Sequence, residues 1–210
     1  MIKDLKQDIF ITGIDTDIGK TIASAIFTEA LNYDYWKPVQ TGGGDTSDTK
    51  TVQELVSNNI SKFHKESFLL KEPVSPHAAA KLENIQIDIN QIKRPQTKNN
   101  LIIEGAGGVF VPFNENDCMI DLIKKLSCCA VVVSRNYLGS INHTILTIEA
   151  LKNKNIPIMG IIFNGDENHE SESFILNYTK LKMILRINNE KEIKSDIILS
   201  YAEKLKKNIL

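Results

Sequence analysis

The tripeptide Gly19-Lys20-Thr21 has the residue types that most directly suggest a chemistry. It follows an apolar segment, residues 9–12, and precedes an alanine- and isoleucine-rich stretch that is typical of a buried helix. In such a loop the backbone N–H groups, the positive end of the helix and a lysine surround a phosphate, and the threonine hydroxyl can ligate Mg²⁺. We therefore predict a phosphate-binding loop, although Gly13 and Gly19 are separated by five residues and the usual pattern has four.

A carboxylate beside such a loop is a second candidate for phosphate chemistry. Residues 101–103 are Leu-Ile-Ile, and Glu104 closes this apolar run before a glycine-rich segment. A carboxylate at a strand end in a phosphate-loop protein is placed to hold Mg²⁺ directly or through water. A purely structural role is the weaker alternative, because a charged residue that closes a buried strand normally needs a partner.

Lys37 and Asp48 are two further charged candidates, and each has a structural alternative. Lys37 lies before Pro38 and the loop of residues 42–44, Gly-Gly-Gly, where backbone can approach a ligand closely. In open α/β sheets ligands bind at the carboxyl ends of strands, which is the expected place of Lys37; the alternative is a surface lysine beside a turn. Either Asp45 or Asp48 could serve only as a helix N-cap.

The start of a predicted helix at residues 138–153 is a candidate for a second anion site. Its first residues, Leu-Gly-Ser-Ile-Asn-His, leave free N–H groups and a helix dipole that could hold a carboxylate, for roughly 0.3–2 kcal/mol. Ser140 could equally be a plain N-cap. Asn164 closes the following strand, where it could bond the edge of a base or merely turn the chain.

The elements that must position these residues are predicted to form a parallel sheet. Residues 130–134 and 157–163 are unbroken apolar runs, as strands covered on both faces require. At Asp88 we favour a capped helix over a strand. Further strands are expected at residues 9–12, 35–41, 101–104 and 182–187, and helices at residues 20–32, 49–57, 78–82, 119–126, 169–179 and 195–210. The predicted fold is α/β, a P-loop NTPase-like parallel β-sheet flanked by helices on both faces, in a single domain over residues 1–210.

Composition and charge argue against several classes of function. The formal net charge of −1 over 210 residues gives no general attraction to nucleic acid or to anionic membrane. We expect neither a signal peptide nor a membrane span, because no apolar run approaches the ~20 residues that cross a bilayer. Three cysteines without disulfide or metal spacing favour a reduced, cytoplasmic protein. His64 and His169 lie among polar residues and are expected to be solvated.

With these segments placed, the chain closely resembles the dethiobiotin synthetase family. The resemblance is carried by residues 13–21, 37–39, 73–77, 104–108, 138–143 and 164, in the family's order, and the longer phosphate loop is the family's own. It implies a homodimer with active sites at the subunit interface and no nucleic-acid or membrane partner. By the same resemblance, CO₂ would add to one amine of 7,8-diaminononanoate, ATP would phosphorylate the carbamate, and the second amine would close the ureido ring.

The resemblance also implies a role for each matching residue. Mg²⁺ would be held by Thr21, Asp48 and Glu104. ATP would contact Asp17, Ile18, Gly19, Lys20, Thr21, Asp48, Glu104 and Asn164, the last of them at the purine. Catalysis would use Thr16, Lys20 and Lys37. The substrate would contact Thr16, Lys37, Thr41 and Gly107, and its carboxylate would be bound across the dimer by Gly139, Ser140, Ile141 and Asn142. His77 and His143 match motif positions and are assigned structural roles.

The chain departs from the family's pattern in two places. Many members wall the base pocket with a Gly-x-Ile-Pro turn, but residues 185–192 read Leu-Arg-Ile-Asn-Asn-Glu-Lys-Glu and neither glycine nor proline follows Gly165. This wall is therefore built differently or left open. Tyr137 stands where a small or basic residue is expected.

Two other classes of phosphate-loop protein compete with this interpretation. An amide ligase that acts on a cobalamin precursor usually carries an attached glutaminase domain, which does not fit in 210 residues. An ATP-switched partitioning or site-selection ATPase would have a second lysine within the loop, where this chain has Asp15 and Asp17. It would also have a C-terminal helix that binds membranes, and only the predicted helix at residues 195–210 supports this alternative.

Overall fold

The computed structural model describes residues 7–43 and 47–209 and contains a seven-stranded sheet. Its strands are β1 (Ile9–Gly13), β2 (Asp34–Trp36), β4 (Phe63–His64), β6 (Leu101–Gly108), β7 (Cys129–Arg135), β8 (Ile158–Asn164) and β9 (Met183–Ile187). Two short strands, β3 (Val39–Gln40) and β5 (Phe68–Leu69), form a separate pair. The order of the large sheet is β4-β2-β6-β1-β7-β8-β9, and every adjacent pair is parallel.

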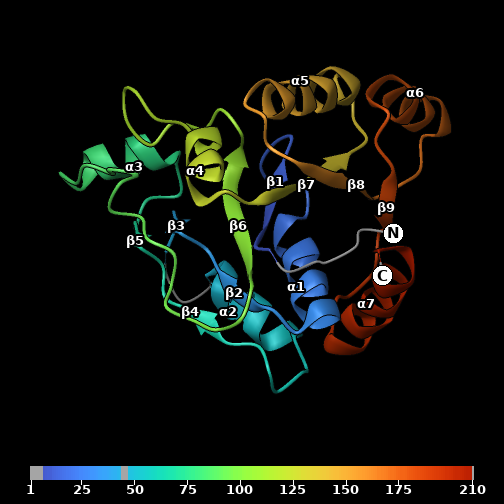
Figure 1. The fold of residues 1–210 in the computed structure, drawn as a ribbon, viewed down its shortest axis with the longest axis horizontal. Helices are drawn as coiled ribbons and strands as arrows, with labels where there is room; N and C mark the ends of the chain where they lie inside the picture. Colours follow the sequence, from blue (N-terminus) through green and yellow to red (C-terminus); the bar gives the residue numbers. More distant parts are fainter. Residues whose placement is uncertain (1–6, 44–46, 210) are drawn as a thin grey trace.

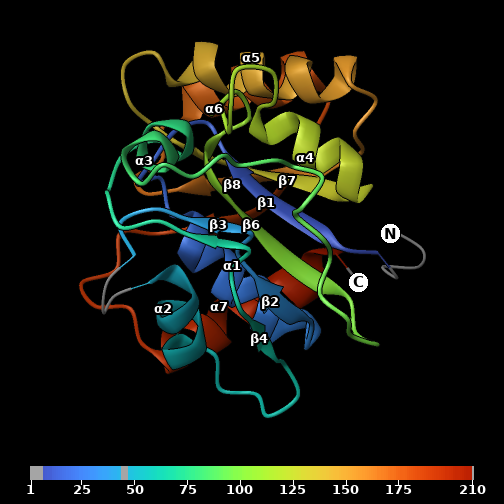
Figure 2. The same ribbon diagram turned by 90° about the vertical axis from the view of Figure 1, so that its left-hand side faces the viewer.

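Helices cover both faces of this sheet, as predicted. They are α1 (Lys20–Leu31), α2 (Asp48–Leu55), α3 (Pro76–Leu82), α4 (Met119–Leu126), α5 (Ser140–Asn153), α6 (His169–Thr179) and α7 (Ser195–Ile209). Figures 1 and 2 show α1, α2 and α7 together on one face and α4, α5 and α6 on the other. No helix among the described residues is long and apolar enough to cross a membrane.

Strand β1 lies in the centre of the sheet, and this position places the phosphate loop. It pairs with β6 on one side and β7 on the other, and Ile9, Phe10 and Ile11 are fully buried. Each such side chain contributes roughly 1.5–3 kcal/mol of hydrophobic stabilisation relative to an exposed one. The loop that leaves β1 therefore emerges from a central, fully buried strand, at the carboxyl edge where α/β proteins bind ligands.

Pro38 divides the segment 35–41 into strands that belong to two different sheets. Strand β2 pairs with β4 and β6, whereas β3 pairs with β5. The carbonyl of Pro38 accepts hydrogen bonds from the backbone of Ser67 and Phe68. Lys37 is thereby fixed between the two sheets.

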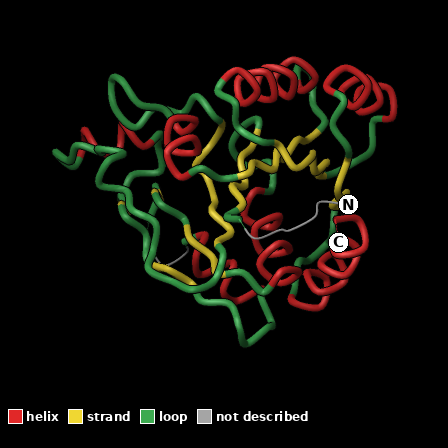
Figure 3. The backbone as a smooth tube through the Cα atoms, in the orientation of Figure 1, coloured by secondary structure: helices red, strands yellow, loops and turns green. Residues whose placement is uncertain are grey.

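Two expectations about secondary structure are wrong. Asp88 does not begin a helix, because its carboxylate accepts the backbone N–H of Asn90 at 2.8 Å and its carbonyl accepts that of Gln91 at 3.0 Å, which closes an isolated turn. The whole connection from α3 to β6 is loop (Figure 3). Glu104 is not the last residue of its strand, since β6 continues to Gly108.

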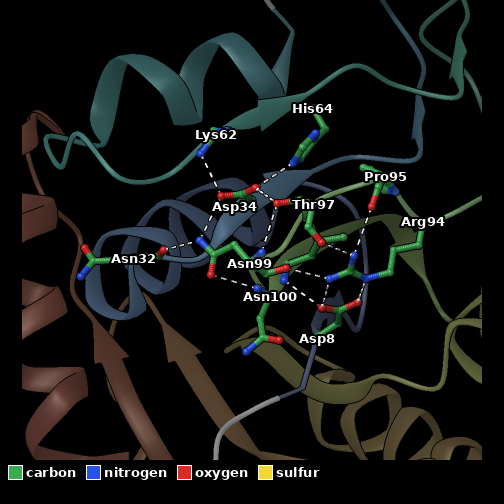
Figure 4. Close-up of polar contacts among 11 residues, drawn as sticks. Asp8, Asn32, Asp34, Lys62, His64, Arg94, Pro95, Thr97, Asn99 and Asn100 are labelled. Carbon is green, nitrogen blue, oxygen red and sulfur yellow. Dashed lines mark hydrogen bonds and ion pairs between the residues drawn. The ribbon is translucent and has the colours of Figure 1, made fainter.

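Two aspartates tie together the amino-terminal ends of the central strands (Figure 4). Arg94 in the long loop donates to both oxygens of Asp8, which precedes β1, at 2.6 and 3.0 Å. Asp34, the first residue of β2, is 1% exposed and accepts hydrogen bonds from Thr97 and Asn99 of the same loop. The loop is thus fastened to two strands without secondary structure of its own.

His64 contributes to this cluster, so the expectation that it is solvated is wrong. Its Nε2 lies 2.9 Å from Asp34 Oδ2, and its side chain is 19% exposed. The two residues lie on neighbouring strands, β4 and β2, and sequence polarity around residue 64 did not reveal this pairing. His169, by contrast, is 80% exposed, as expected.

Candidate active site

A cavity of about 560 Å³ opens where the phosphate loop meets the ends of β2 and β6. Ten of the predicted site residues line it: Thr16, Asp17, Gly19, Lys20, Thr21, Lys37, Thr41, Asp48, Glu104 and Gly107. They come from four separate segments of the chain, 16–21, 37–41, 48 and 104–107. The structure therefore brings together the residues predicted for the phosphates, the metal and the reacting groups.

Gly19 is required by the close approach of Asn164 to the phosphate loop. Its φ of 93° is in the left-handed region, and a Cβ there would lie 2.3 Å from Asn164 Nδ2. Asn164 donates that amide to the carbonyl of Ile18 at 2.8 Å. The N-cap position of α1 is thus a glycine without a side-chain cap, which leaves the helix N-terminus open toward the cavity.

The ammonium of Lys20 folds back over the loop. Its Nζ donates to the carbonyl of Asp15 at 2.7 Å, and its side chain is almost fully buried. Burial, followed by repulsion from Lys37, lowers the pKa of Lys20 from 10.5 to about 8. An anion bound in the loop would favour the charged form of this side chain.

Lys37 is bound by two carboxylates at the floor of the cavity. Its Nζ lies 2.5 Å from Asp48 Oδ2 and 3.0 Å from Glu104 Oε1. It is 5% exposed, so the alternative of a surface lysine is wrong. Burial alone would lower the pKa of Lys37, but Glu104 and Asp48 outweigh it and raise the pKa above its usual value.

Asp48 is the first residue of α2 and not its cap. Ser47 is the N-cap residue and accepts the backbone N–H of Lys50, so the carboxylate of Asp48 is free to face the cavity. Burial opposes ionisation of Asp48, yet Lys37 and a hydrogen bond from Thr21 hold its pKa below the usual value. Asp45, the other candidate cap, and Gly44 lie outside the described residues.

The hydroxyl oxygen of Thr21 and one carboxylate oxygen from each of Asp48 and Glu104 lie close together. The Thr21 hydroxyl lies 3.0 Å from Asp48 Oδ1 and 3.0 Å from Glu104 Oε1, and one hydroxyl proton can serve only one of these acceptors at a time. Such a set suits Mg²⁺, which prefers oxygen ligands and usually takes one or two carboxylates together with substrate phosphates. Within the part of the chain that the structure describes, no group of three or more His, Cys, Asp or Glu side chains could hold an ion.

Two side chains of this site were not predicted from the sequence. Tyr35 is fully buried and donates its hydroxyl to Glu104 Oε2 at 2.8 Å. Gln40 accepts the backbone N–H of Asp48 at 3.2 Å and so fixes the start of α2. The signal for Tyr35 was its place two residues before Lys37 along the strand direction, where side chains share a face; Gln40 gave no comparable signal.

Gly139, Ser140, Ile141 and Asn142 lie apart from this cavity. They line a second one, of about 760 Å³, at the start of α5. Gly139, with φ of 103°, is the N-cap residue and no side chain caps the helix, so the alternative that Ser140 is a plain N-cap is wrong. The N-terminus of α5 is therefore available to an anion.

Tyr137 connects the two regions. Its hydroxyl lies 2.8 Å from His143 Nδ1 on α5, and the side chain also interacts electrostatically with Asp15 in the phosphate loop. Burial, followed by this aspartate, raises the pKa of Tyr137. The residue that departs from the family's pattern thus joins the loop to the helix that carries the second cavity.

Cavity volume alone would place the site elsewhere. A cavity of about 900 Å³ lies at the amino-terminal end of the sheet, beside Asp34 and His64. The polar side chains there already bind one another, and the loop, helix N-terminus and lysines that suit phosphate lie at the opposite edge. We therefore assign the site to the smaller cavity.

Comparison with known sequences identifies close relatives. A family model described as an AAA domain matches residues 7–196. The chain is 48% identical over 205 residues to the ATP-dependent dethiobiotin synthetase BioD of Christiangramia forsetii, covering 98% of this chain and 99% of the relative. It is 49% identical over 197 residues to the protein of the same name from Cytophaga hutchinsonii, covering 93% and 95%.

Solved structures with a similar fold come from more distant proteins. The septum site-determining protein MinD of Pyrococcus horikoshii, complexed with Mg-ADP, matches with a TM-score of 0.57 and 14% identity over 96% of each chain. A ParA family ATPase from Chlorobium tepidum matches with a TM-score of 0.52 and 15% identity, covering 97% and 96%. At these identities the likeness confirms the parallel P-loop fold alone and lends no support to a partitioning or site-selection function.

Proposed function

Because the chain belongs to the dethiobiotin synthetase family, we propose that the cavity beside its phosphate loop is the active site in which the ureido ring of dethiobiotin is closed in an ATP-consuming reaction. The activity is ATP-dependent dethiobiotin synthesis in biotin biosynthesis, the activity of relatives nearly half identical over almost the whole chain. The observation that supports this placement most strongly is the buried contact of Lys37 with Asp48 and Glu104, next to Lys20 of the loop.

The proposed substrates are 7,8-diaminononanoate, CO₂ and ATP. One amine adds to CO₂ and loses a proton, which gives a carbamate. A carbamate oxygen attacks the γ-phosphorus of ATP, and the bond from that phosphorus to the β,γ-bridging oxygen breaks to release ADP. The second amine then attacks the carbonyl carbon of the mixed anhydride, the carbon–oxygen bond to phosphate breaks, and the amine loses its proton as the ring closes.

The two lysines address the main obstacle to the second step, which is the approach of two anions. Lys20 would bind the β- and γ-phosphates, while Lys37 would face the carbamate and the transferring phosphoryl group. Preorganised charges of this kind act strongly in a buried site because they need no reorganisation during the reaction. Thr16 at the mouth of the cavity would contribute a hydroxyl to the same groups, and Thr41 and Gly107 would contact the substrate.

Thr21, Asp48 and Glu104 fit Mg²⁺ by the chemistry of their oxygens, and we propose them as its ligands. When bound, Mg²⁺ would neutralise part of the charge on the β- and γ-phosphates. Asp17, Ile18, Gly19 and Asn164 complete the proposed nucleotide site, in which Asn164 both holds the loop through Ile18 and lies beside the expected base.

We further propose a homodimer in which Gly139 to Asn142 bind the carboxylate of a substrate held by the partner. Their separation from the reaction cavity supports this, since the two cavities share no lining residue among the residues that the structure describes. Exposed apolar side chains surround both regions: Phe110 is 64% exposed, Leu138 103% and Leu146 57%. Phe110 and Leu146 line one cavity together with Asp15 of the phosphate loop. An apolar surface next to an incomplete site suits a subunit interface.

The remaining proposals concern the whole chain. One domain over residues 1–210 is supported by the seven-stranded sheet, which includes both β1 and β9, and by a core that spans it. A cytoplasmic location suits three cysteines, of which none forms a disulfide among the described residues.

The decisive experiment is to measure ADP release with ATP, Mg²⁺ and bicarbonate, with and without 7,8-diaminononanoate, and to identify the product by mass. We expect release that depends on the diamine and yields dethiobiotin. Release that is indifferent to the diamine would overturn the proposed substrate and leave an ATPase without an assigned acceptor.

A further inference from the structure

We propose that the ammonium of Lys37 occupies the divalent-cation site of the nucleotide-free protein, so that the metal enters only together with the nucleotide. The inference rests on the proposed function, because it takes Thr21, Asp48 and Glu104 as the metal ligands. It adds a second task for Lys37, before the reaction begins.

The contacts of Lys37 carry the first step. Its Nζ binds Asp48 Oδ2 at 2.5 Å and Glu104 Oε1 at 3.0 Å, and Glu104 Oε1 is also one of the two carboxylate oxygens within 3.0 Å of the Thr21 hydroxyl. A metal bound to these carboxylates would stand within a few ångströms of the ammonium. Because both are cations in a buried pocket, they compete for the same oxygens.

The charges of the side chains around Lys37 carry the second step. Asp48 and Glu104 are balanced by Lys20 and Lys37, so the cluster has no net charge before any ligand arrives. A divalent cation on its own would leave two positive charges uncompensated in a poorly solvated site. The phosphates of a nucleotide bring the missing negative charge, and Asp17, which also faces Lys20, is exposed and screened by water.

The third step follows from the burial of Lys37. At 5% exposure its ammonium needs an anionic partner, and the carboxylates provide it in the empty protein. When a metal takes these carboxylates, the nearest replacement is the anion in the cavity, either phosphate or carbamate. Arrival of the metal–nucleotide pair therefore also delivers Lys37 to the reacting groups.

The test measures binding of Mn²⁺, a paramagnetic probe for the Mg²⁺ site, by electron paramagnetic resonance, with and without ADP. In the absence of nucleotide, Lys37→Met should bind Mn²⁺ at least about tenfold more tightly than the wild type, equivalent to ~1.4 kcal/mol. Lys20→Met is the matched control, since it removes the same charge from the same cavity but its Nζ contacts the Asp15 carbonyl and not the carboxylates. It should increase the affinity by a smaller factor.

Lys37→Gln keeps an N–H donor for the carboxylates and serves if Lys37→Met does not fold; it should also bind free Mn²⁺ more tightly than the wild type. Equal affinity of the wild type and the Lys37 variants for free Mn²⁺, or equal effects of Lys37→Met and Lys20→Met, would overturn the inference. The proposed metal site is tested separately with Asp48→Asn and Glu104→Gln. If both variants bind Mn²⁺ with ADP as tightly as the wild type does, the metal site itself is wrong.

Discussion

At the scale of single residues, two lysines in one cavity have opposite environments. Lys20 is buried near another cation, and the pKa of its ammonium falls to about 8, whereas two carboxylates raise the pKa of Lys37. Lys20 therefore gains most from an arriving phosphate, while Lys37 is already neutralised. This difference supports the roles proposed above, in which Lys20 binds the nucleotide and Lys37 contributes mainly during the reaction.

Replacing Lys37 tests that separation. Lys37→Ala should lower kcat by at least about 10³-fold, because removal of one preorganised charge that faces the reacting groups costs roughly 3–4 kcal/mol. The Kd for ADP, measured by calorimetry, should stay within a few-fold of the wild-type value. Near-normal turnover in this variant would remove Lys37 from the mechanism.

At the scale of elements, side-chain hydrogen bonds hold the segment after β9, where many family members have a Gly-x-Ile-Pro turn. The hydroxyl of Tyr201 on α7 accepts the backbone N–H of Asn188 at 3.0 Å and donates to Glu190 at 2.5 Å. The residue before this segment, Ile187, pairs with Asn164 at the proposed base site. The segment is thus ordered without the glycine and proline that many family members use.

This construction predicts weak selection of the nucleotide base. With no Gly-x-Ile-Pro wall, GTP or CTP should support turnover within several-fold of ATP when kcat/KM is compared at saturating diamine. A strong preference for ATP would show that another segment supplies the wall.

The network at Asp34 predicts how stability depends on pH. Burial opposes ionisation of Asp34, but hydrogen bonds from His64, Thr97, Asn99 and the Lys62 backbone hold its pKa below 3.8. A lowered folded-state pKa gives stability that is present above the unfolded pKa of about 3.9 and is lost as the pH falls through the folded value. Asp34→Asn should therefore be less stable by ~1–3 kcal/mol at pH 7.

Urea unfolding from pH 7 down to pH 2 measures this effect. The wild type should lose more stability below about pH 4 than Asp34→Asn does. Asp166→Asn, at an exposed position on the other side of the sheet, is the control and should follow the wild-type curve. Parallel curves for Asp34→Asn and the wild type would contradict the role assigned to Asp34.

The elements could be predicted from sequence wherever a local signal decided them. The apolar runs at residues 130–134 and 157–163 became β7 and β8, and the glycine-lysine-threonine motif lies where it was expected. The prediction of a helix at Asp88 was wrong because an aspartate that caps a turn and one that caps a helix have the same local sequence. The prediction that His64 is solvated was wrong because its partner, Asp34, lies thirty residues away in sequence, on a neighbouring strand. The Lys37 contacts likewise depend on pairing between distant segments, which periodicity does not report.

At the scale of the whole molecule, three of the exposed apolar residues lie near the carboxyl edge of the sheet. Phe110 follows β6, Leu138 precedes α5, and Leu146 lies on α5. All three are near residues of the two proposed half-sites. One surface would therefore serve both assembly and catalysis.

Charged substitutions on this surface test the proposed dimer. Phe110→Asp or Leu146→Asp should halve the mass measured by light scattering and raise the KM for the diamine at least about tenfold, since the carboxylate contact across the interface is lost. Leu199→Asp on α7, at a residue 42% exposed on the opposite face, is the matched control and should keep the wild-type mass. A monomeric wild type with full activity would overturn the shared site.

The central position of β1 also bears on how the protein is made. This strand is synthesised well before its two neighbours, since β6 and β7 begin about ninety and one hundred and twenty residues later. Pairings between segments so distant in sequence slow folding, because a long loop must close before any contact forms. The nascent chain therefore carries an apolar strand without its sheet partners while about ninety further residues are made, and in that interval we expect β1 to be a target of chaperones that hold growing polypeptides.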